Sequence, residues 1–422
     1  MKYIVILGDG MSDHPVSELG GLTPLEAACK PCMDRLAREG CCGMLETVPE
    51  GIMPGSEAAN LSVMGYNPAE ILQGRGVLEA ASMGLQINEG ELVMRCNLIC
   101  LNEEGRLKNH SAGHISSEEA AKIIHDLQEK FGSQQFSFYP GVSYRHVFIA
   151  KGLDARIKCT PPHDYLGELA AKLPIESLCE EAKETAEILN RLTAQTQEWL
   201  PKHPTNRKRI AEGKDPANSI WLWSGGYKPK MWTYQEHFGI TGAVISAVDL
   251  IRGIGVYAGL KVISVEGATG LYDTNYEGKA AACLEALKDY DFVYLHVEAP
   301  DEAGHEGNAA LKIQTIEDLD SRLVAPLLKG LEDTQTEAII GLLPDHPTPV
   351  STRAHTREPV PFAIWGPGFE PDSVSAYSEA LCANGKFGLL KEDQFIKLLL
   401  GKTECAPISK YEYCANQSGD SI

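Results

Sequence analysis

The sequence lacks an apolar run long enough to cross a membrane and is short of basic residues. Its 38 lysines and arginines are outnumbered by 58 aspartates and glutamates, which gives a net charge of -20. Such a protein repels nucleic-acid backbones and anionic lipid headgroups. No stretch approaches the about 20 apolar residues of a transmembrane helix. These deficits argue against nucleic acid or a membrane as a partner.

A secretion signal is also lacking, because the apolar stretch from Tyr3 to Leu7 is too short for a signal peptide. We therefore expect a cytoplasmic protein whose 12 cysteines are reduced thiols. Cys29 and Cys32 form a C-x-x-C pair, a pattern that also occurs in zinc and redox sites. The surrounding EAACKPCMDRLAREG has helical apolar periodicity, so we interpret the pair as small buried side chains of one helix.

Strand-like and helical patterns alternate towards the end of the chain. VISVEG, DFVYLHVEAP and TEAIIGLLPDH read as strands, and EGKAAACLEALKDY separates two of them as a helix. KYIVILG forms a further strand at the start. This alternation predicts an α/β fold with a mostly parallel sheet and helices on both faces. Ligands of such sheets bind beyond the carboxyl ends of the strands.

The middle of the chain has a different pattern, with the charged helical run IESLCEEAKETAEILNRLTAQTQEWL and the alternating segment SYRHVFIA. At 422 residues the chain is long enough for two domains. We therefore predict a smaller α+β domain over residues 73–244, inserted into an α/β domain formed by residues 1–72 and 245–422. No low-complexity linker marks these boundaries.

Ligand-type side chains follow three of the expected strands. They are Asp9, Asp301, His305, Asp345, His346 and His355, and the loop MPGSEAAN adds the hydroxyl of Ser56. The spacing of Asp301 and His305 places both on one face of a helical turn. Together, these carboxylates and imidazoles are sufficient for two metal ions with open positions.

Each residue also has a simpler interpretation. An adjacent Asp-His pair is often a solvated turn, and Asp9 is also typical of a turn or a cap. Ser56 alone is typical of the N-cap of the helix that continues as EAANLSVMG. The metal hypothesis rests on the set, since three separate strand ends all carry ligand-type residues.

Several longer segments resemble one family. ILGDGMSD, MPGSEAANLSVMGYNPAEILQGRGVLEA, APDEAGHEGN and PDHPTPVSTRAHTREPVPF are similar to the archaeal-type branch of the cofactor-independent phosphoglycerate mutases, in the alkaline phosphatase superfamily. The resemblance covers nearly the whole chain in order. It implies an alkaline-phosphatase-like core, an isomerase that interconverts 3- and 2-phosphoglycerate, and no need for 2,3-bisphosphoglycerate.

The resemblance also implies a role for each residue of the set. Ser56 would be the nucleophile that becomes phosphoserine. One divalent ion would be held by Asp9, Ser56, Asp345 and His346, and a second by Asp301, His305 and His355. Nitrogen and oxygen ligands favour Mn²⁺, with Zn²⁺ and Mg²⁺ as alternatives. The inserted domain would supply cations for the small phosphorylated substrate and exclude water. We expect the substrate binders to be Arg75, His110, His114, Arg145, Arg252 and Lys279.

Two segments depart from the family pattern. In NHSAGHIS, His110, Ser111 and His114 stand where arginines are usual, and Trp223 replaces another arginine. Arginine binds phosphate and carboxylate bidentately, so these exchanges change the expected substrate contacts. A sub-branch with such a sequence is proposed to be homoserine kinase. The same ligand-type residues would also suit phosphomonoester hydrolysis or a non-catalytic metal-bound protein. No P-loop or kinase glycine-rich loop supports ATP binding.

Overall fold

The computed structural model describes residues 1–402, which form two compact units. Unit 1 comprises Met1–Leu72 and the chain from Met231 onward, and unit 2 comprises Gln73–Lys230. The domain boundary expected at residue 244 is wrong, because it falls inside β10 (Gly242–Ile245), a strand of the unit 1 sheet. No helix in the described part of the chain is both long and apolar enough to span a membrane.

Unit 1 is built on an eight-stranded, mostly parallel sheet, as predicted. In spatial order its strands are β11 (Lys261–Ile263), β10, β12 (Phe292–Val297), β1 (Lys2–Gly8), β13 (Ala338–Leu343), β14 (Val360–Trp365), β2 (Cys41–Glu46) and β15 (Leu389–Lys391). Strand β1 pairs in parallel with β12 and β13, so Tyr3 lies beside Phe292 and Ile339. Among the described strands of this sheet, only β14 runs antiparallel to its neighbours.

Helices cover both faces of this sheet. They are α1 (Pro24–Ala27), α2 (Pro31–Glu39), α3 (Ser56–Val63), α4 (Pro68–Ile71), α9 (Tyr234–His237), α10 (Asp249–Tyr257), α11 (Tyr276–Asp289), α12 (Ala299–Glu306), α13 (Ala309–Leu319), α14 (Ala325–Asp333), α15 (Glu379–Cys382) and α16 (Gln394–Leu399). A 3-10 turn spans Ser17–Leu19, and a π-helical turn over Asp320–Val324 joins α13 to α14.

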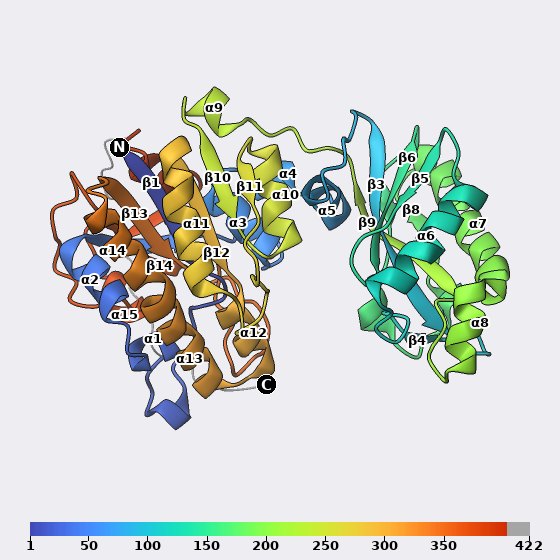
Figure 1. Ribbon diagram of the computed structural model, residues 1–422, viewed down its shortest axis with the longest axis horizontal. Coiled ribbons are helices and arrows are strands. Elements are labelled where there is room, and N and C mark those ends of the chain that lie inside the picture. Colours follow the sequence, from blue (N-terminus) through green and yellow to red (C-terminus); the bar gives the residue numbers. More distant parts are fainter. Residues whose placement is uncertain (403–422) are drawn as a thin grey trace. The chain divides into compact units, whose positions relative to one another are not determined.

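The two faces of the sheet are buried by different helices. Ile4 and Ile6 of β1 belong to a core cluster with residues of α2, α11, α13 and α14, and Figure 1 shows α11 and α14 lying over the strands. On the other face, Gly341 of β13 packs so closely on α16 that a Cβ there would lie 2.8 Å from Phe395. Burial on both faces explains why β1 and β13 read as continuous apolar runs. Each fully buried Ile or Leu contributes about 1.5–3 kcal/mol.

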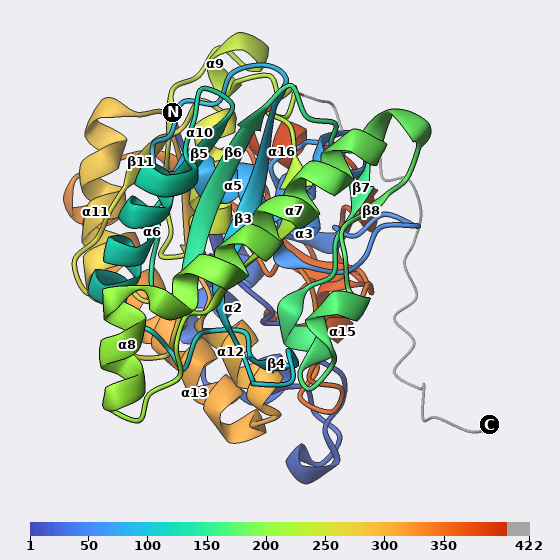
Figure 2. The same ribbon diagram turned by 90° about the vertical axis from the view of Figure 1, so that its right-hand side faces the viewer.

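Unit 2 contains a five-stranded antiparallel sheet in which β3 has a central place. Its elements are α5 (Arg75–Ser82), β3 (Glu91–Leu101), β4 (Leu107–Asn109), α6 (Ser117–Phe131), β5 (Phe136–Tyr139), β6 (Arg145–Lys151), β7 (Ile157–Lys158), β8 (Glu176–Ser177), α7 (Lys183–Trp199), α8 (Pro204–Ala211) and β9 (Ser219–Gly226), with 3-10 turns at Pro162–Tyr165, Ala170–Lys172, Glu180–Ala182 and Leu200–Lys202. Figure 2 shows α6 and α7 over one face, where alternate residues of β3, such as Met94 and Cys96, join the core.

The single helix expected around Cys29 and Cys32 is wrong. The structure has α1 and α2 with a break between them, because the residue before Pro31 is disfavoured in helical conformation and Lys30 is not helical. The break exposes Cys29, contrary to the expectation that both thiols are buried. Both thiols are free, and neither belongs to a metal-ligand cluster of the described residues.

Candidate metal and phosphoryl-transfer site

Three strand ends of unit 1 bring carboxylates together. Strand β1 ends at Gly8, directly before Asp9, and the main-chain N–H of Gly10 donates to Asp345 Oδ1 at 3.1 Å. Gly10 has a φ of +60°, and a Cβ on it would lie 2.5 Å from Asp301 Oδ1. Only glycine meets both conditions without strain. This turn therefore allows the loops after β1, β12 and β13 to meet.

Asp301, His305 and His355 form the first cluster of ligand-type atoms. The Nε2 atom of His305 lies 3.2 Å from Asp301 Oδ2 and 2.9 Å from His355 Nε2, which is 3.4 Å from Asp301 Oδ1. Asp301 and His305 share a turn of α12, as their spacing predicted. The hydrogen bond to Asp301 raises the pKa of His305 to about 9. Burial alone would raise the pKa of Asp301, but hydrogen bonds from the two imidazoles hold it well below its ordinary value.

His305 can offer a ligand atom only after losing the Nε2 proton that it donates to Asp301. Its Nδ1 lies 3.0 Å from the carbonyl oxygen of Arg353, which can only accept, so Nδ1 carries the proton. In the neutral imidazole the Nε2 lone pair then faces His355 and Asp301. A carbonyl that fixes the tautomer in this way is usual around metal-binding histidines.

Asp9, Ser56, Asp345 and His346 form the second cluster. His346 Nε2 lies 3.3 Å from Ser56 Oγ, 3.4 Å from Asp345 Oδ2 and 3.6 Å from Asp9 Oδ1. Asp9, Asp345 and His346 are fully buried, and Ser56 is nearly so. The two clusters adjoin, since ligand atoms of Asp301, His346 and His355 lie within 4.8 Å of one another.

Ser56 does not cap the helix, contrary to the simpler interpretation of its sequence. Helix α3 begins at Ser56 itself, and the preceding Gly55 occupies the N-cap without a side-chain hydrogen bond. The hydroxyl of Ser56 is therefore not used by its own helix and lies beside His346. This geometry places the Ser56 hydroxyl at the positive end of a helix dipole.

The charge of the site fits divalent cations. Burial raises the pKa of Asp9 well above its ordinary value, and the neighbouring Asp345, Glu298 and Asp301 raise it further. Asp9 Oδ1 is buried without a hydrogen-bond partner. An ionised carboxylate with an unpaired buried oxygen is costly unless a cation binds it. The donor set of carboxylate oxygens, imidazole nitrogens and one hydroxyl suits such a cation.

Several residues that orient this donor set were not predicted from the sequence. The side-chain amide of Asn60 donates to Asp345 Oδ2 at 2.8 Å and to the carbonyl of Ser56 at 2.9 Å, while the Tyr294 hydroxyl donates to Asn60 Oδ1 at 2.6 Å. Thr348 Oγ1 donates to Asp301 Oδ1. The signal available in the sequence was weak: DFVYLHV places two polar side chains at alternate positions of an otherwise apolar strand.

His296 and Glu298 were also missed. His296 Nε2 lies 2.8 Å from Asp9 Oδ2 and 3.6 Å from Glu298 Oε2. With Asp9 they form a third group of ligand-type atoms. Burial, followed by Asp301 and Asp345, raises the pKa of Glu298 to about 8.

The two substrate binders expected in unit 1 have protein partners. Lys279 of α11 is fully buried, and its ammonium donates to the carbonyl of His296 at 2.9 Å. The Arg252 guanidinium donates to Ser264 Oγ at 2.8 Å and lies 3.8 Å from Asp249. The Lys279 ammonium is therefore not exposed to a substrate, whereas the Nε atom of Arg252 is buried without a hydrogen-bond partner.

In unit 2 the expected binders lie in a patch of cations and aromatic rings. The Arg145 guanidinium is 5.8 Å from the ring centre of Tyr144, which is 5.6 Å from the His110 ring. His110 in turn is 6.1 Å from the His163 ring. Burial lowers the pKa of His110, and the neighbouring His163 and His114 lower it further.

Arg95 belongs to the same patch and was missed by sequence analysis. Its guanidinium lies 4.4 Å from the ring centre of Trp223, in the range of a cation–π contact. Burial lowers the pKa of Arg95; Glu79 opposes this, and the positive charges of Arg75 and Arg145 add to it. Trp223, at a position where the resemblance implied an arginine, therefore carries the guanidinium of Arg95 on its ring.

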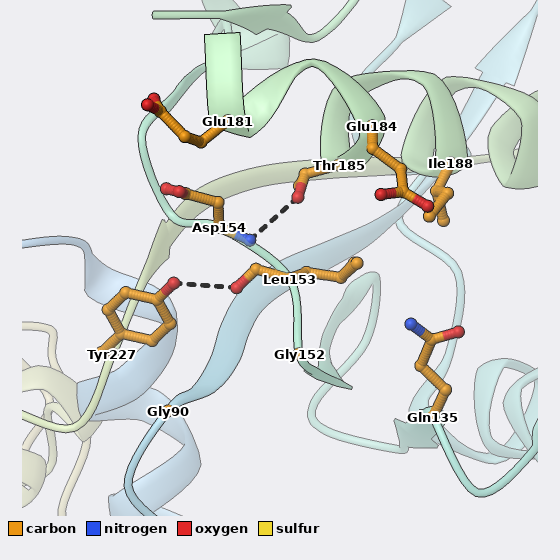
Figure 3. Close-up of a pocket in the computed structure, with 10 residues that line it drawn as sticks. All are labelled: Gly90, Gln135, Gly152, Leu153, Asp154, Glu181, Glu184, Thr185, Ile188 and Tyr227. Atoms are coloured by element: carbon orange, nitrogen blue, oxygen red, sulfur yellow. Dashed lines mark hydrogen bonds between the residues drawn. The ribbon is translucent and has the colours of Figure 1, made fainter. Parts of the chain in front are cut away.

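A pocket elsewhere in unit 2 does not suit an anionic substrate. It has a volume of about 380 Å³. Figure 3 shows the carboxylates of Asp154, Glu181 and Glu184 around it, with the Tyr227 hydroxyl bonded to the carbonyl of Leu153. It contains none of the residues proposed from the sequence. Three carboxylates would repel a phosphate ester.

Comparison with known proteins assigns the family. A family model described as 2,3-bisphosphoglycerate-independent phosphoglycerate mutase matches residues 37–206. A protein of that name from Methanosarcina acetivorans is 50% identical over 402 residues, 95% of this chain and 100% of that protein. A "probable" mutase of the same kind from Geobacter sulfurreducens is also 50% identical, over 94% of this chain and 98% of that protein.

Two solved structures are similar over nearly the whole chain. The PH0037 protein from Pyrococcus horikoshii aligns with a TM-score of 0.80 at 32% identity, covering 96% of this chain and 98% of that one. The cofactor-independent phosphoglycerate mutase from Thermoplasma acidophilum aligns with a TM-score of 0.67 at 26% identity, covering 95% and 99%. The resemblance seen in the sequence is thereby confirmed: this chain belongs to the family of 2,3-bisphosphoglycerate-independent phosphoglycerate mutases, which are isomerases.

Proposed function

We propose that the chain interconverts 3-phosphoglycerate and 2-phosphoglycerate through a phosphoserine on Ser56. The observation that carries this proposal is the position of Ser56 Oγ, 3.3 Å from His346 Nε2 and at the first residue of α3. A hydroxyl among ligand-type side chains at a helix N-terminus is suited to accept a phosphoryl group. Family membership supports the same reaction.

The residues of the two clusters would hold two divalent cations. Asp9, Ser56, Asp345 and His346 would bind one, and Asp301, His305 and His355 the other; Mn²⁺ fits this nitrogen and oxygen set best. When bound, such ions lower the pKa of a coordinated hydroxyl and stabilise negative charge on phosphoryl oxygens. The unpaired Asp9 Oδ1 supports this assignment.

The chain's own residues would carry the transfer in two steps. Ser56 Oγ attacks the phosphorus of 3-phosphoglycerate, the bond from phosphorus to O3 breaks, and O3 leaves with a proton as a hydroxyl of glycerate. O2 of the retained glycerate then attacks the phosphoserine, the bond to Oγ breaks, and Ser56 regains its proton. Asn60 would keep Ser56 and Asp345 in fixed relative positions during both steps, because its side-chain amide donates to the carbonyl of Ser56 and to Asp345 Oδ2.

Unit 2 would bind the glycerate through its cationic patch. Arg75 and Arg145 supply fixed positive charge, and His110 and His114 add imidazoles, whereas Arg95 is buried and pairs with Glu79 at 3.2 Å. Stacking on Trp223 holds Arg95 in one orientation at little further entropic cost.

Phosphorus NMR tests this proposal directly. The purified chain would be incubated with 3-phosphoglycerate and Mn²⁺, without ATP or 2,3-bisphosphoglycerate. We expect 2-phosphoglycerate to appear without inorganic phosphate. Inorganic phosphate alone would identify a phosphomonoesterase instead. No change in the spectrum would reject both activities, and the same sample with homoserine and ATP would then test the kinase alternative.

A further inference from the structure

His296 occupies the centre of a fully buried network that ends on Asp9. It lies on β12, and its side chain has no exposed surface. Its Nε2 is 2.8 Å from Asp9 Oδ2, and its Nδ1 is 3.1 Å from Ser246 Oγ. The main-chain carbonyl of the same residue accepts a hydrogen bond of 2.9 Å from the ammonium of Lys279. The side chain and the backbone of His296 are therefore both fixed.

Hydrogen-bond chemistry determines where the proton of this imidazole lies. When Nδ1 accepts from Ser246 Oγ, the proton of the neutral imidazole lies on Nε2, which donates to Asp9 Oδ2. Ser246 Oγ accepts from the main-chain N–H of Val248 at 3.0 Å, which leaves its own proton for Nδ1. The neutral imidazole in this one tautomer thus makes a hydrogen bond at each ring nitrogen. No other orientation of the ring would satisfy both Asp9 and Ser246 equally.

The bond from His296 leaves the two oxygens of Asp9 unequal. Oδ2 accepts from His296, while Oδ1 has no partner and lies 3.6 Å from His346 Nε2. We propose that His296 is a positioning residue that, held by Lys279 and Ser246, fixes Asp9 so that Oδ1 faces the metal beside Ser56. This inference rests on the metal site of the proposed function.

The same network gives Lys279 a role other than substrate binding. Its ammonium is buried against the end of β12, where it holds the His296 carbonyl. A lysine in contact with substrate would affect the KM for 3-phosphoglycerate. A lysine that positions His296 instead affects metal affinity, because its loss frees the strand end that carries the imidazole.

A direct ligand role for His296 is the rival interpretation. Asp9, His296 and Glu298 lie close enough to hold a cation of their own, and Glu298 Oε2 has no hydrogen-bond partner. However, Nε2 cannot donate its proton to Asp9 and offer a lone pair to a metal at the same time. The rival therefore requires the bond of 2.8 Å to break, and it predicts a third ion per chain that is lost when His296 is replaced.

The test compares Mn²⁺ binding by His296→Leu and His296→Gln. Each variant is titrated with Mn²⁺, and binding is measured by calorimetry and by the electron paramagnetic resonance signal of free Mn²⁺. The Gln side-chain amide can still donate to Asp9, whereas Leu cannot. We expect Leu to weaken Mn²⁺ binding roughly 10- to 100-fold, the usual effect of losing a residue that orients a ligand, and Gln to restore most of it. Both variants should bind two ions per chain at saturation.

Two further variants allow the proposal to be tested even if His296→Leu folds poorly. Ser246→Ala removes only the donor to Nδ1 and should weaken Mn²⁺ binding roughly fivefold, the worth of one hydrogen bond. His146→Leu is the matched control, because His146 is a buried histidine of unit 2 that bonds the main chain at Gly141. It should leave Mn²⁺ affinity unchanged.

The outcomes separate this inference from the proposed function. Tight Mn²⁺ binding by the wild type together with unchanged affinity in His296→Leu and Ser246→Ala would overturn the inference alone. Gln no better than Leu would also overturn it, since general packing would then explain the loss. A drop from three ions to two would establish the rival. A wild type that binds no Mn²⁺ would overturn the proposed function and this inference with it.

Discussion

The ammonium of Lys312 and the carboxylate of Asp13 form an ion pair of 2.8 Å in which neither side chain is exposed to solvent. The same ammonium donates to the carbonyls of Ser12 and Thr348, each at 2.9 Å. These three acceptors come from the loops after β1 and β13, the two loops that also carry Asp9 and Asp345. One cation of α13 thus ties together the segments on which the site is built.

Replacement of Lys312 by methionine should destabilise the chain by about 3–5 kcal/mol, because it leaves the charge of Asp13 buried and unpaired. Urea unfolding followed by circular dichroism measures this cost. The double variant Lys312→Met/Asp13→Leu should recover part of it. Lys108→Met is a matched control, since Lys108 pairs with Asp215 at 2.6 Å but is 56% exposed, and its loss should cost far less because solvent screens the pair. Equal costs for the two lysines would contradict this account.

Replacement of Ser56 by alanine should abolish mutase turnover while the chain stays folded. The only buried group removed is a hydroxyl at the start of α3, where it makes no capping bond. The measurement is the rate of 2-phosphoglycerate formation, with metal content determined on the same samples. Ser62→Ala is the control, because the Ser62 hydroxyl bonds only the carbonyl of Ala58 on the same helix. Residual turnover in Ser56→Ala comparable to the wild type would exclude a phosphoserine at this position.

Replacement of Tyr294 by phenylalanine should cost about 1–3 kcal/mol of stability, because Asn60 Oδ1 would lose its buried donor. Tyr276→Phe provides a close control: that hydroxyl is buried without a partner, so its removal should be nearly neutral. Thermal unfolding of both variants measures the difference. If Tyr276→Phe proved the more damaging of the two, the Tyr294–Asn60 bond would not be the source of the effect.

Replacement of Gly10 by alanine should weaken metal binding as well as stability. The substitution adds strain at a positive φ, at about 1–2 kcal/mol, and places a methyl group against Asp301. Gly20→Ala separates the two effects, since Gly20 has a φ of +71° but no atom near its Cβ position. We expect both variants to lose stability and only Gly10→Ala to lose Mn²⁺ affinity. Equal affinity in the two variants would show that the loops do not need this close approach.

Glu379 should make stability depend on pH. Burial raises its pKa from 4.5 to about 7 in the folded chain, so the folded state holds this proton more tightly than the unfolded state. The contribution of this carboxyl group to the stability of the chain is therefore largest below about pH 4.5. It falls as the pH rises towards 7, by up to about 3 kcal/mol. Glu379→Gln removes this dependence. Unfolding at pH 5 and pH 8 should show the variant gaining on the wild type at the higher pH, and a difference independent of pH would refute the assignment.

The sequence was sufficient to predict the elements whose patterns are local. The runs of β1, β12 and β13 are continuous and apolar, and the ligand-type residues follow them directly, so both the sheet and the position of Asp9 and Asp345 could be expected. The Asp301–His305 spacing was informative because one helical turn determines it.

Residues that act through long-range contacts could not be found in this way. His296 lies within an apolar run and meets Asp9 only because two strands 287 residues apart in sequence are neighbours. Lys279 was expected to bind substrate because nothing in the local sequence shows that its ammonium is buried against the end of β12. The boundary at residue 244 was misplaced because β10 is four residues long and has no flanking signal of its own.

The pairing of β1 with β12 and β13 constrains how the chain can fold during synthesis. Strand β1 is synthesised before β12, and Tyr3 finds its neighbour Phe292 only after roughly 15 to 60 s of further translation. Unit 2 is a continuous segment and can complete its own sheet during that interval. A nascent chain that stalls before β12 would therefore carry one finished domain and one apolar strand with both edges open, the kind of species that chaperones bind and that aggregates when they do not.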